Sequence, residues 1–271
     1  MISTLKKFLR QNKYTEILAY ILQNNNILNS SGSGEFGNTI EEMYSHNISL
    51  AELYAKNFDG DLQNKIVLEL GTGFSRSAML YLVKKFNIKK AYCYDRFKCL
   101  HKNDKEIIKL YGLSPYLEKI EYISGVNEHL LKIKLSSIDY VVSNAVLEHV
   151  YDLELLFSLL VRLLNDNAQM YHKVDLRCHN RFKKYGELYF HTFSEKFWKM
   201  MGSKIGQPNR KLLNDYHTLF DKLNLIYSTN IIEEFSDEEL AKAARYLNNI
   251  DIKDYKASII DFKILKNQYK G

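Results

Sequence analysis

The chain has 271 residues and is 46% hydrophobic, which is enough for one large domain with a substantial core. Its formal net charge is +6, but the lysines occur as scattered pairs without a basic block, which argues against sequence-specific nucleic-acid binding. No apolar run approaches the roughly 20 residues of a membrane span. The N-terminal sequence lacks the pattern of a signal peptide, so we expect a cytoplasmic protein.

The first predicted elements are helices that precede the core. Apolar residues recur at helical spacing over the first two dozen residues, and a helical pattern resumes over 48–58. Between them, residues 24–38 have the Gly and Ser content of a loop. We expect residues 1–60 to form a helical cap or lid, with Tyr44 reaching a bound substrate, over a core of residues 61–271.

From residue 65 onward, predicted strands and helices alternate, which favours a mostly parallel sheet with helices on both faces. The expected strands are 65–70, 90–94, 119–124, 137–144 and 168–176, and the expected helices are about 75–86, 102–111 and 153–164.

The region after the fifth strand breaks this rhythm. Residues 177–209 are polar and rich in aromatic side chains, and such an excursion after a strand's carboxyl end predicts a substrate-binding insertion. A helix is expected over about 210–223, and the last strands over 225–229 and 257–265. The helix between them begins at Ser236 with capping-box spacing. We expect the last two strands to close the sheet as an antiparallel edge.

The turn after the first strand carries the strongest chemical signal. Gly71 and Gly73 stand between a strand and a helix, where glycine lets backbone N–H groups approach a ligand. The dinucleotide fingerprint requires a third glycine, but Arg76 stands in that place. Glu69 would also repel a pyrophosphate. A nicotinamide or flavin ligand is therefore disfavoured. Two interpretations of the segment remain: a turn without a ligand, or a site for another adenosine-bearing ligand.

Asp95 closes the second strand about 20 residues beyond the glycines, where an acid binds ribose hydroxyls in nucleotide folds. Glu69 could hold a cationic amino group. Both could instead be solvated charges at strand ends, but their placement on consecutive strands favours a ligand made of adenosine and an amino-acid tail.

Three motifs in order resemble the class I S-adenosylmethionine-dependent methyltransferases. VLELGTG resembles the first motif of that family, YDRF the second, and SIDYVVSNAVLEHV the fourth, over roughly residues 60–176. The resemblance implies an α/β, three-layer Rossmann-like methyltransferase fold with a seven-stranded, mostly parallel sheet and an N-terminal helical extension. It also implies S-adenosylmethionine as cofactor, with S-adenosylhomocysteine as product.

The resemblance places the methionine part of the cofactor beside Glu69 and the two glycines, the ribose on Asp95, and the sulfonium near Asn144 and Ala145. Arg96 or Phe97 would lie along the adenine. The family often has an acid after Gly125, where this chain has Val126, so Asn127 or a backbone carbonyl is the expected adenine partner. The implied cofactor-binding residues are Glu69, Gly71, Thr72, Gly73, Asp95, Arg96, Asn127, Asn144 and Ala145.

Candidate acceptor-side residues follow the fourth and fifth strands. His149 is a candidate base or a packing residue, and His179 and Asp175 follow as further catalytic candidates. In a subset of bacterial methyltransferases with a similar fifth strand and an Asn-Arg pair, which this segment resembles, Arg177 or Arg210 would bind an anionic part of the substrate. Asp175 and Arg177 could equally pair with each other. The spacing of His172, Asp175 and His179 matches no metal site, and none is predicted.

The sequence therefore predicts a methyltransferase acting on a polar acceptor, preferably an oxygen atom. The expected substrate is a small molecule, a nucleotide-linked sugar or a surface-glycan precursor, including a phosphate or phosphoramidate group of a bacterial capsule pathway. Nucleic acid is not the expected partner. An RNA methyltransferase and a non-catalytic adenosine-binding module are the alternatives, with a nicotinamide-dependent oxidoreductase third. The composition, rich in Lys, Asn, Ile and Tyr, is typical of an AT-rich bacterial genome.

Overall fold

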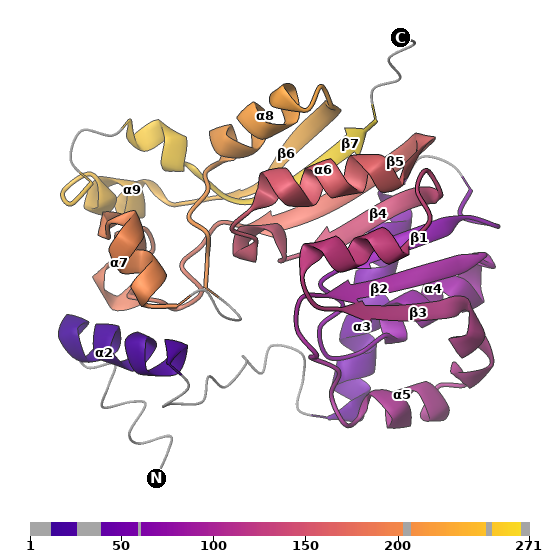
Figure 1. Cartoon of the computed structure of the whole chain (residues 1–271). Helices are drawn as coiled ribbons and strands as arrows, with labels where there is room; N and C mark the ends of the chain where they lie inside the picture. Colours follow the sequence, from indigo (N-terminus) through magenta and orange to yellow (C-terminus); the bar gives the residue numbers. More distant parts are fainter. Residues whose placement is uncertain (1–11, 26–38, 59–60, 203–206, 248–250, 267–271) are drawn as a thin grey trace.

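The computed structural model describes residues 12–25, 39–58, 61–202, 207–247 and 251–266. Its centre is a seven-stranded sheet with strand order β3-β2-β1-β4-β5-β7-β6 (Figure 1). The strands are β1 Ile66–Leu70, β2 Lys90–Asp95, β3 Ile120–Ser124, β4 Ile138–Asn144, β5 Leu164–Asp175, β6 Ile226–Glu234 and β7 Ala257–Leu265.

The first five strands pair in parallel, and β7 pairs antiparallel with both β5 and β6. The expected mostly parallel sheet with an antiparallel edge is confirmed. Two strand boundaries were wrong: β5 begins at Leu164, before an irregularity in its pairing with β4, and β6 continues to Glu234. β6 lies at the sheet edge with most residues exposed, so its second half has no apolar alternation that sequence reasoning could detect.

Helices cover both faces of the sheet and make the three layers. In Figure 1, α3 and α4 lie behind the sheet and α6 in front of it. Alternating side chains of β1 point into the two layers: Val67 belongs to the hydrophobic cluster that includes α3 and α4, and Leu68 and Leu70 belong to the cluster that includes α6 and α8. The helices are α2 Lys13–Asn24, α3 Ile40–Lys56, α4 Ser77–Phe86, α5 Asp104–Leu110, α6 Leu153–Leu163, α7 Glu195–Met200, α8 Leu213–Lys222 and α9 Asp237–Ala243.

The two described N-terminal helices have different neighbours. Ala51 and Tyr54 of α3 are buried against α4, so α3 belongs to the helical layer behind the sheet. Helix α2 instead contacts the insertion, because the Glu16 carboxylate accepts hydrogen bonds from the Tyr20 hydroxyl (3.0 Å) and from the Phe182 N–H (2.9 Å). Of the loop predicted at 24–38, Asn24 ends α2 and Asn25 caps it, and the rest lies outside the described residues. The role of residues 1–60 as a lid stays a prediction.

The aromatic side chains of the insertion form a small core of their own. Phe182, Phe190 and Trp198 are fully buried in it, together with Tyr20 of α2. Helix α9 contacts the insertion, because the Glu239 carboxylate accepts a hydrogen bond from the Glu187 N–H (3.0 Å). Ser236 caps this helix, but Glu239 does not complete the expected capping box. Within the described ranges, no helix combines the length and the apolar character needed to cross a membrane.

Candidate active site

The glycine turn after β1 is bound to β2 through its backbone and lies against a side chain that follows β4. The Gly71 N–H donates to the Tyr94 carbonyl (2.7 Å) at the end of β2. Gly71 has φ +73°, and a Cβ there would lie 2.2 Å from a methyl group of Val146, which follows β4. Glycine is needed at this position both for the backbone conformation and for the close approach of the two turns.

Asp95 ends β2 and holds the same turn. Its carboxylate accepts the Gly73 N–H (2.9 Å) on one oxygen and the Phe97 N–H (2.9 Å) on the other. Burial raises the pKa of Asp95 above its usual value, and these two hydrogen bonds oppose the rise. The oxygen bound to Phe97 also accepts a long hydrogen bond from Cys99 Sγ (3.8 Å), whereas the oxygen bound to Gly73 still has a lone pair with which to accept a hydrogen bond from a ligand.

Glu69 is the second-to-last residue of strand β1 and is buried beside Asp95. Burial, with a further contribution from the charge of Asp95, raises the pKa of Glu69 to about 8. Its Oε2 has no hydrogen-bond partner among the described residues. A buried carboxyl in this state would be stabilised in its charged form by a cation that a ligand brings.

Arg76, the residue in the place of the third dinucleotide glycine, is bound to the first residue of α5. Its Nε and Nη2 donate to the Asp104 carboxylate at 3.1 and 2.6 Å, and its backbone N–H donates to the other oxygen at 2.9 Å. The arginine therefore fixes the turn to α5 through a buried acid.

The remaining cofactor candidates lie at the carboxyl ends of their strands or just beyond them. Arg96 is exposed after β2, and Asn127 Oδ1 lies 3.0 Å from the Tyr94 hydroxyl. Asn144 ends β4, and the exposed Ala145 has φ +52°, a conformation rare for a residue with a Cβ. Such backbone strain is concentrated at functional sites.

Tyr44, the predicted lid contact, stacks on Tyr111 after α5 with ring centroids 3.5 Å apart. It packs with Leu80 and Ile108, so the structure places it among the helices behind the sheet.

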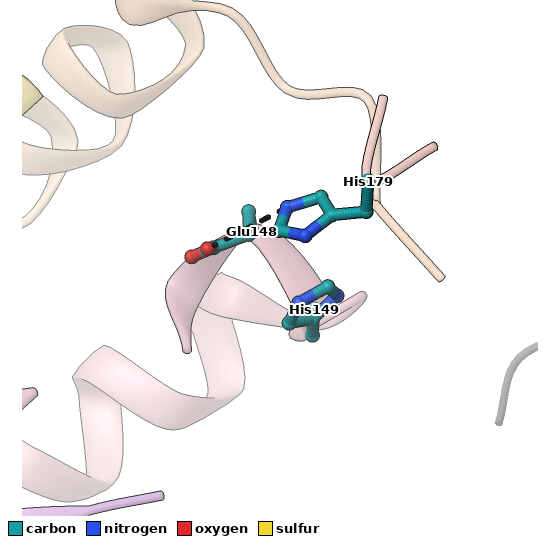
Figure 2. A group of neighbouring side chains, drawn as sticks. All are labelled: Glu148, His149 and His179. Atoms are coloured by element: carbon teal, nitrogen blue, oxygen red, sulfur yellow. Dashed lines mark ion pairs between the residues drawn. The ribbon is translucent and has the colours of Figure 1, made fainter. Parts of the chain in front are cut away.

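On the acceptor side, three side chains gather at the carboxyl ends of β4 and β5: Glu148 and His149 in the short 3-10 helix η3 (Leu147–His149), and His179 after β5 (Figure 2). Glu148 Oε1 accepts the Asp175 N–H (3.3 Å) and lies 3.9 Å from His179 Nε2. Burial raises the pKa of Glu148 well above its usual value. Sequence reasoning missed Glu148, although it directly precedes His149.

His149 is an unprotonated imidazole at neutral pH. Burial and the neighbouring His179, whose ring centroid is 4.8 Å away, lower the pKa of His149 to about 4. Its Nδ1 is buried without a hydrogen-bond partner in the described part of the chain. An imidazole with so low a pKa is a weak base, but its lone pair can bind a ligand.

Asp175 and Arg177 pair with each other, one of the two arrangements that the sequence left open. Arg177 Nε and Nη2 donate to the two carboxylate oxygens at 2.8 and 2.6 Å. Burial alone would raise the pKa of Asp175, but the hydrogen bonds from Arg177 outweigh it and hold the pKa below its usual value. His179 Nε2 lies 3.3 Å from the Asp175 backbone carbonyl, and the Asp175 carboxylate is taken by Arg177.

The Asn-Arg pair after the insertion has two structural roles. Asn209 Nδ2 donates to the carbonyls of Leu147 (2.9 Å) and Val150 (2.7 Å), and its N–H donates to the Glu148 carbonyl (2.6 Å). Asn209 thereby fixes η3. The Arg210 side chain is buried within the insertion, where it donates to the Phe193 carbonyl and to the Glu195 carboxylate.

Comparison with known proteins agrees with the fold. Residues 68–171 match the family model described as a methyltransferase domain. Phosphoethanolamine N-methyltransferase 2 of Haemonchus contortus, in complex with S-adenosylmethionine, is similar in structure (TM-score 0.54, 18% identity); the match covers 97% of this chain and 60% of that one. Geranyl diphosphate C-methyltransferase of Streptomyces coelicolor A3(2) is similar over 98% of both chains (TM-score 0.54, 11% identity). No curated protein matches the sequence.

Residues 68–171 match the methyltransferase domain model, and the strand order and structural neighbours show the fold of the class I S-adenosylmethionine-dependent methyltransferases that the resemblance implied. S-adenosylmethionine is the methyl donor that defines this class, as the sequence predicted. The chain spans about 60% of the length of the Haemonchus protein. The two neighbours methylate nitrogen and carbon by their names, so the fold leaves the acceptor atom open.

Proposed function

We propose that this protein transfers a methyl group from S-adenosylmethionine to an oxygen atom of a small polar acceptor. The observation that carries the proposal is the cluster of Glu148, His149 and His179 at the carboxyl ends of β4 and β5. β4 pairs with β1, whose turn carries the glycines, and β5 lies on the other side of β4; ligands of open α/β sheets bind outside the carboxyl ends of such strands. Nucleotide-linked sugars and bacterial surface-glycan precursors, including their phosphate or phosphoramidate groups, are the substrates we favour.

The reaction is an in-line displacement. A lone pair of the acceptor oxygen forms the new bond to the methyl carbon while the electrons of the carbon–sulfur bond return to sulfur, leaving neutral S-adenosylhomocysteine. A hydroxyl acceptor must also lose its proton, whereas an anionic oxygen need not. The donor and the acceptor must be aligned, so their positioning supplies much of the rate acceleration. We assign the positioning of the acceptor to the side chains that surround His179.

The cofactor contacts are part of the proposal. Glu69 would hold the cationic amino group of the methionine part, and Asp95 would accept hydrogen bonds from the ribose hydroxyls. Their burial on neighbouring strand tips, with an unpartnered oxygen on Glu69, supports both assignments.

The affinity for S-adenosylmethionine should rise with pH in the range from about 6 to 7.5. Because the pKa of Glu69 is raised to about 8, its carboxyl is mostly protonated in the free protein and must lose the proton to hold a cation. Binding should release about one proton and strengthen by up to roughly tenfold per pH unit below that pKa. Calorimetry in two buffers of different ionisation enthalpy measures the release. Glu69→Gln should bind more weakly and release none; equal release from that variant would contradict the assignment.

The function is tested by measuring S-adenosylhomocysteine formed from S-adenosylmethionine with a panel of acceptors. The panel contains sugar hydroxyls, phosphate monoesters, phosphoramidates, matched amines and unmodified RNA. Turnover with an oxygen acceptor, lost in His179→Asn while cofactor binding persists, is the expected result. Turnover with RNA, at an affinity that falls steeply with salt, would replace the proposal with the RNA alternative. Cofactor binding without turnover on any acceptor would favour a binding module.

A further inference from the structure

The acceptor-side cluster has the composition of a metal centre. Glu148, His149 and His179 each offer one ligand atom, and the three atoms lie within 4.8 Å of one another. Figure 2 shows the His179 ring directed at the Glu148 carboxylate, with the His149 ring beside it. Two imidazoles and one carboxylate form a ligand set that proteins use for zinc and for non-haem iron, with coordination positions left open.

Two atoms of this cluster are buried without a partner. Within the described residues, neither Glu148 Oε2 nor His149 Nδ1 has a hydrogen bond, and the Glu148 side chain is almost wholly enclosed. Buried polar atoms are almost always satisfied, so the two unsatisfied atoms in this cluster have lone pairs available to a ligand. A single cation that accepts lone pairs from all three side chains would satisfy both atoms.

We propose that Glu148, His149 and His179 bind one divalent transition-metal ion of the zinc or iron kind. The two imidazole nitrogens of this ligand set disfavour magnesium, because Mg²⁺ prefers a shell of oxygen ligands and retains its bound water.

The distances allow this with small movements. Glu148 Oε1 and His179 Nε2 are 3.9 Å apart, and two ligand atoms of a tetrahedral zinc site stand roughly 3.4 Å apart. His179 can move, because the hydrogen bond that its ring makes within the described residues, to the Asp175 carbonyl at 3.3 Å, is long. Glu148 and His149 are held in place, because Asn209 fixes the η3 backbone on both sides.

The backbone at His179 also points to a site under constraint. His179 has φ +49°, in the left-handed region that side-chain-bearing residues rarely adopt. The spacing of His172, Asp175 and His179 predicted no metal site, and the structure gives the first two of these residues other partners. His172 Nδ1 lies 2.8 Å from Ser143 Oγ, and the Asp175 carboxylate is bound to Arg177. The proposed ligand set replaces these two residues with Glu148 and His149.

Three protein ligands leave at least one position open on the ion. Placed at the carboxyl ends of β4 and β5, that position would take the acceptor oxygen, orient it and favour loss of its proton. This role rests on the proposed methyltransferase function, whereas binding of the ion itself does not.

The test uses the full-length chain, stripped of metal with a chelator. Titration with Zn²⁺ alone should give one bound ion per chain, and Co²⁺ should give visible absorption bands of a site with nitrogen and oxygen ligands. Glu148→Gln and His179→Asn should weaken Zn²⁺ binding by more than the roughly 100-fold that loss of a mere outer-sphere partner costs. Gln retains the shape of Glu148, and Asn tolerates the left-handed backbone at His179.

His217→Gln is the matched control, because this histidine lies on α8 and contacts Thr229, outside the cluster. It should bind Zn²⁺ as the wild type does. Absence of stoichiometric Zn²⁺ binding, full binding by Glu148→Gln, equal loss in the control, or equal binding of Mg²⁺ would each overturn the metal site. S-adenosylmethionine binding, measured on the same samples, reports the fold and the cofactor site independently, so failure of the metal site leaves the methyltransferase proposal standing.

Discussion

Asp95→Ala will weaken S-adenosylmethionine binding by about 100-fold or more. Two hydrogen bonds from ribose hydroxyls to a carboxylate contribute roughly 1.5–3 kcal/mol each, and each 1.4 kcal/mol is about a factor of ten in affinity. The same substitution removes the acceptors of the Gly73 and Phe97 N–H groups, which loosens the glycine turn. Isothermal titration measures the loss of affinity for S-adenosylmethionine and for S-adenosylhomocysteine.

Asp95→Asn disturbs the turn less than Asp95→Ala does, because the amide keeps the shape of the carboxylate and one of the two oxygens that accept the Gly73 and Phe97 N–H groups. We expect at least a tenfold loss. Asp139→Asn is the control: its carboxylate also accepts a backbone N–H, that of Ile66 at 2.7 Å, but at the opposite end of β1. Cofactor affinity should be unchanged there. Wild-type affinity in a folded Asp95→Asn variant would reduce Asp95 to a cap of the turn.

Gly71→Ala will destabilise the fold by about 2–5 kcal/mol and abolish cofactor binding. The left-handed backbone costs a residue with a Cβ roughly 1–2 kcal/mol, and overpacking against Val146 adds roughly 1–3 kcal/mol. Urea unfolding measures the free energy. Adding Val146→Ala should recover the packing component but not the backbone component, which gives a coupling energy between the two sites.

Gly112→Ala is the control for the backbone component. Gly112 also has positive φ (+63°), but no heavy atom lies within 4 Å of the position where a Cβ would stand. It should lose only the roughly 1–2 kcal/mol of the left-handed conformation. If Gly71→Ala were no more destabilising than Gly112→Ala, the contact with Val146 would have no energetic weight.

Sequence reasoning located the strands whose side chains are buried, because burial imposes an apolar pattern. It failed on the second half of β6, where exposure on the sheet edge removes that pattern. It placed Glu69 and Asp95 on neighbouring strand tips, since parallel strands end at one edge. It could not anticipate that Val146 touches Gly71 or that Asn209 holds η3, because these contacts join residues far apart in the chain. Glu148 was missed because burial of a charge is unexpected before its neighbours are known.

The hydrogen bond from Phe182 to Glu16 joins residues 166 positions apart and has a consequence for engineering. Helix α2 and the insertion share one hydrophobic cluster, so they form a single module encoded in two separate stretches of the gene. Grafting residues 177–209 alone into another methyltransferase would leave the aromatic side chains of that module uncovered. A transfer of the predicted substrate-binding insertion between relatives therefore requires both stretches to be moved together.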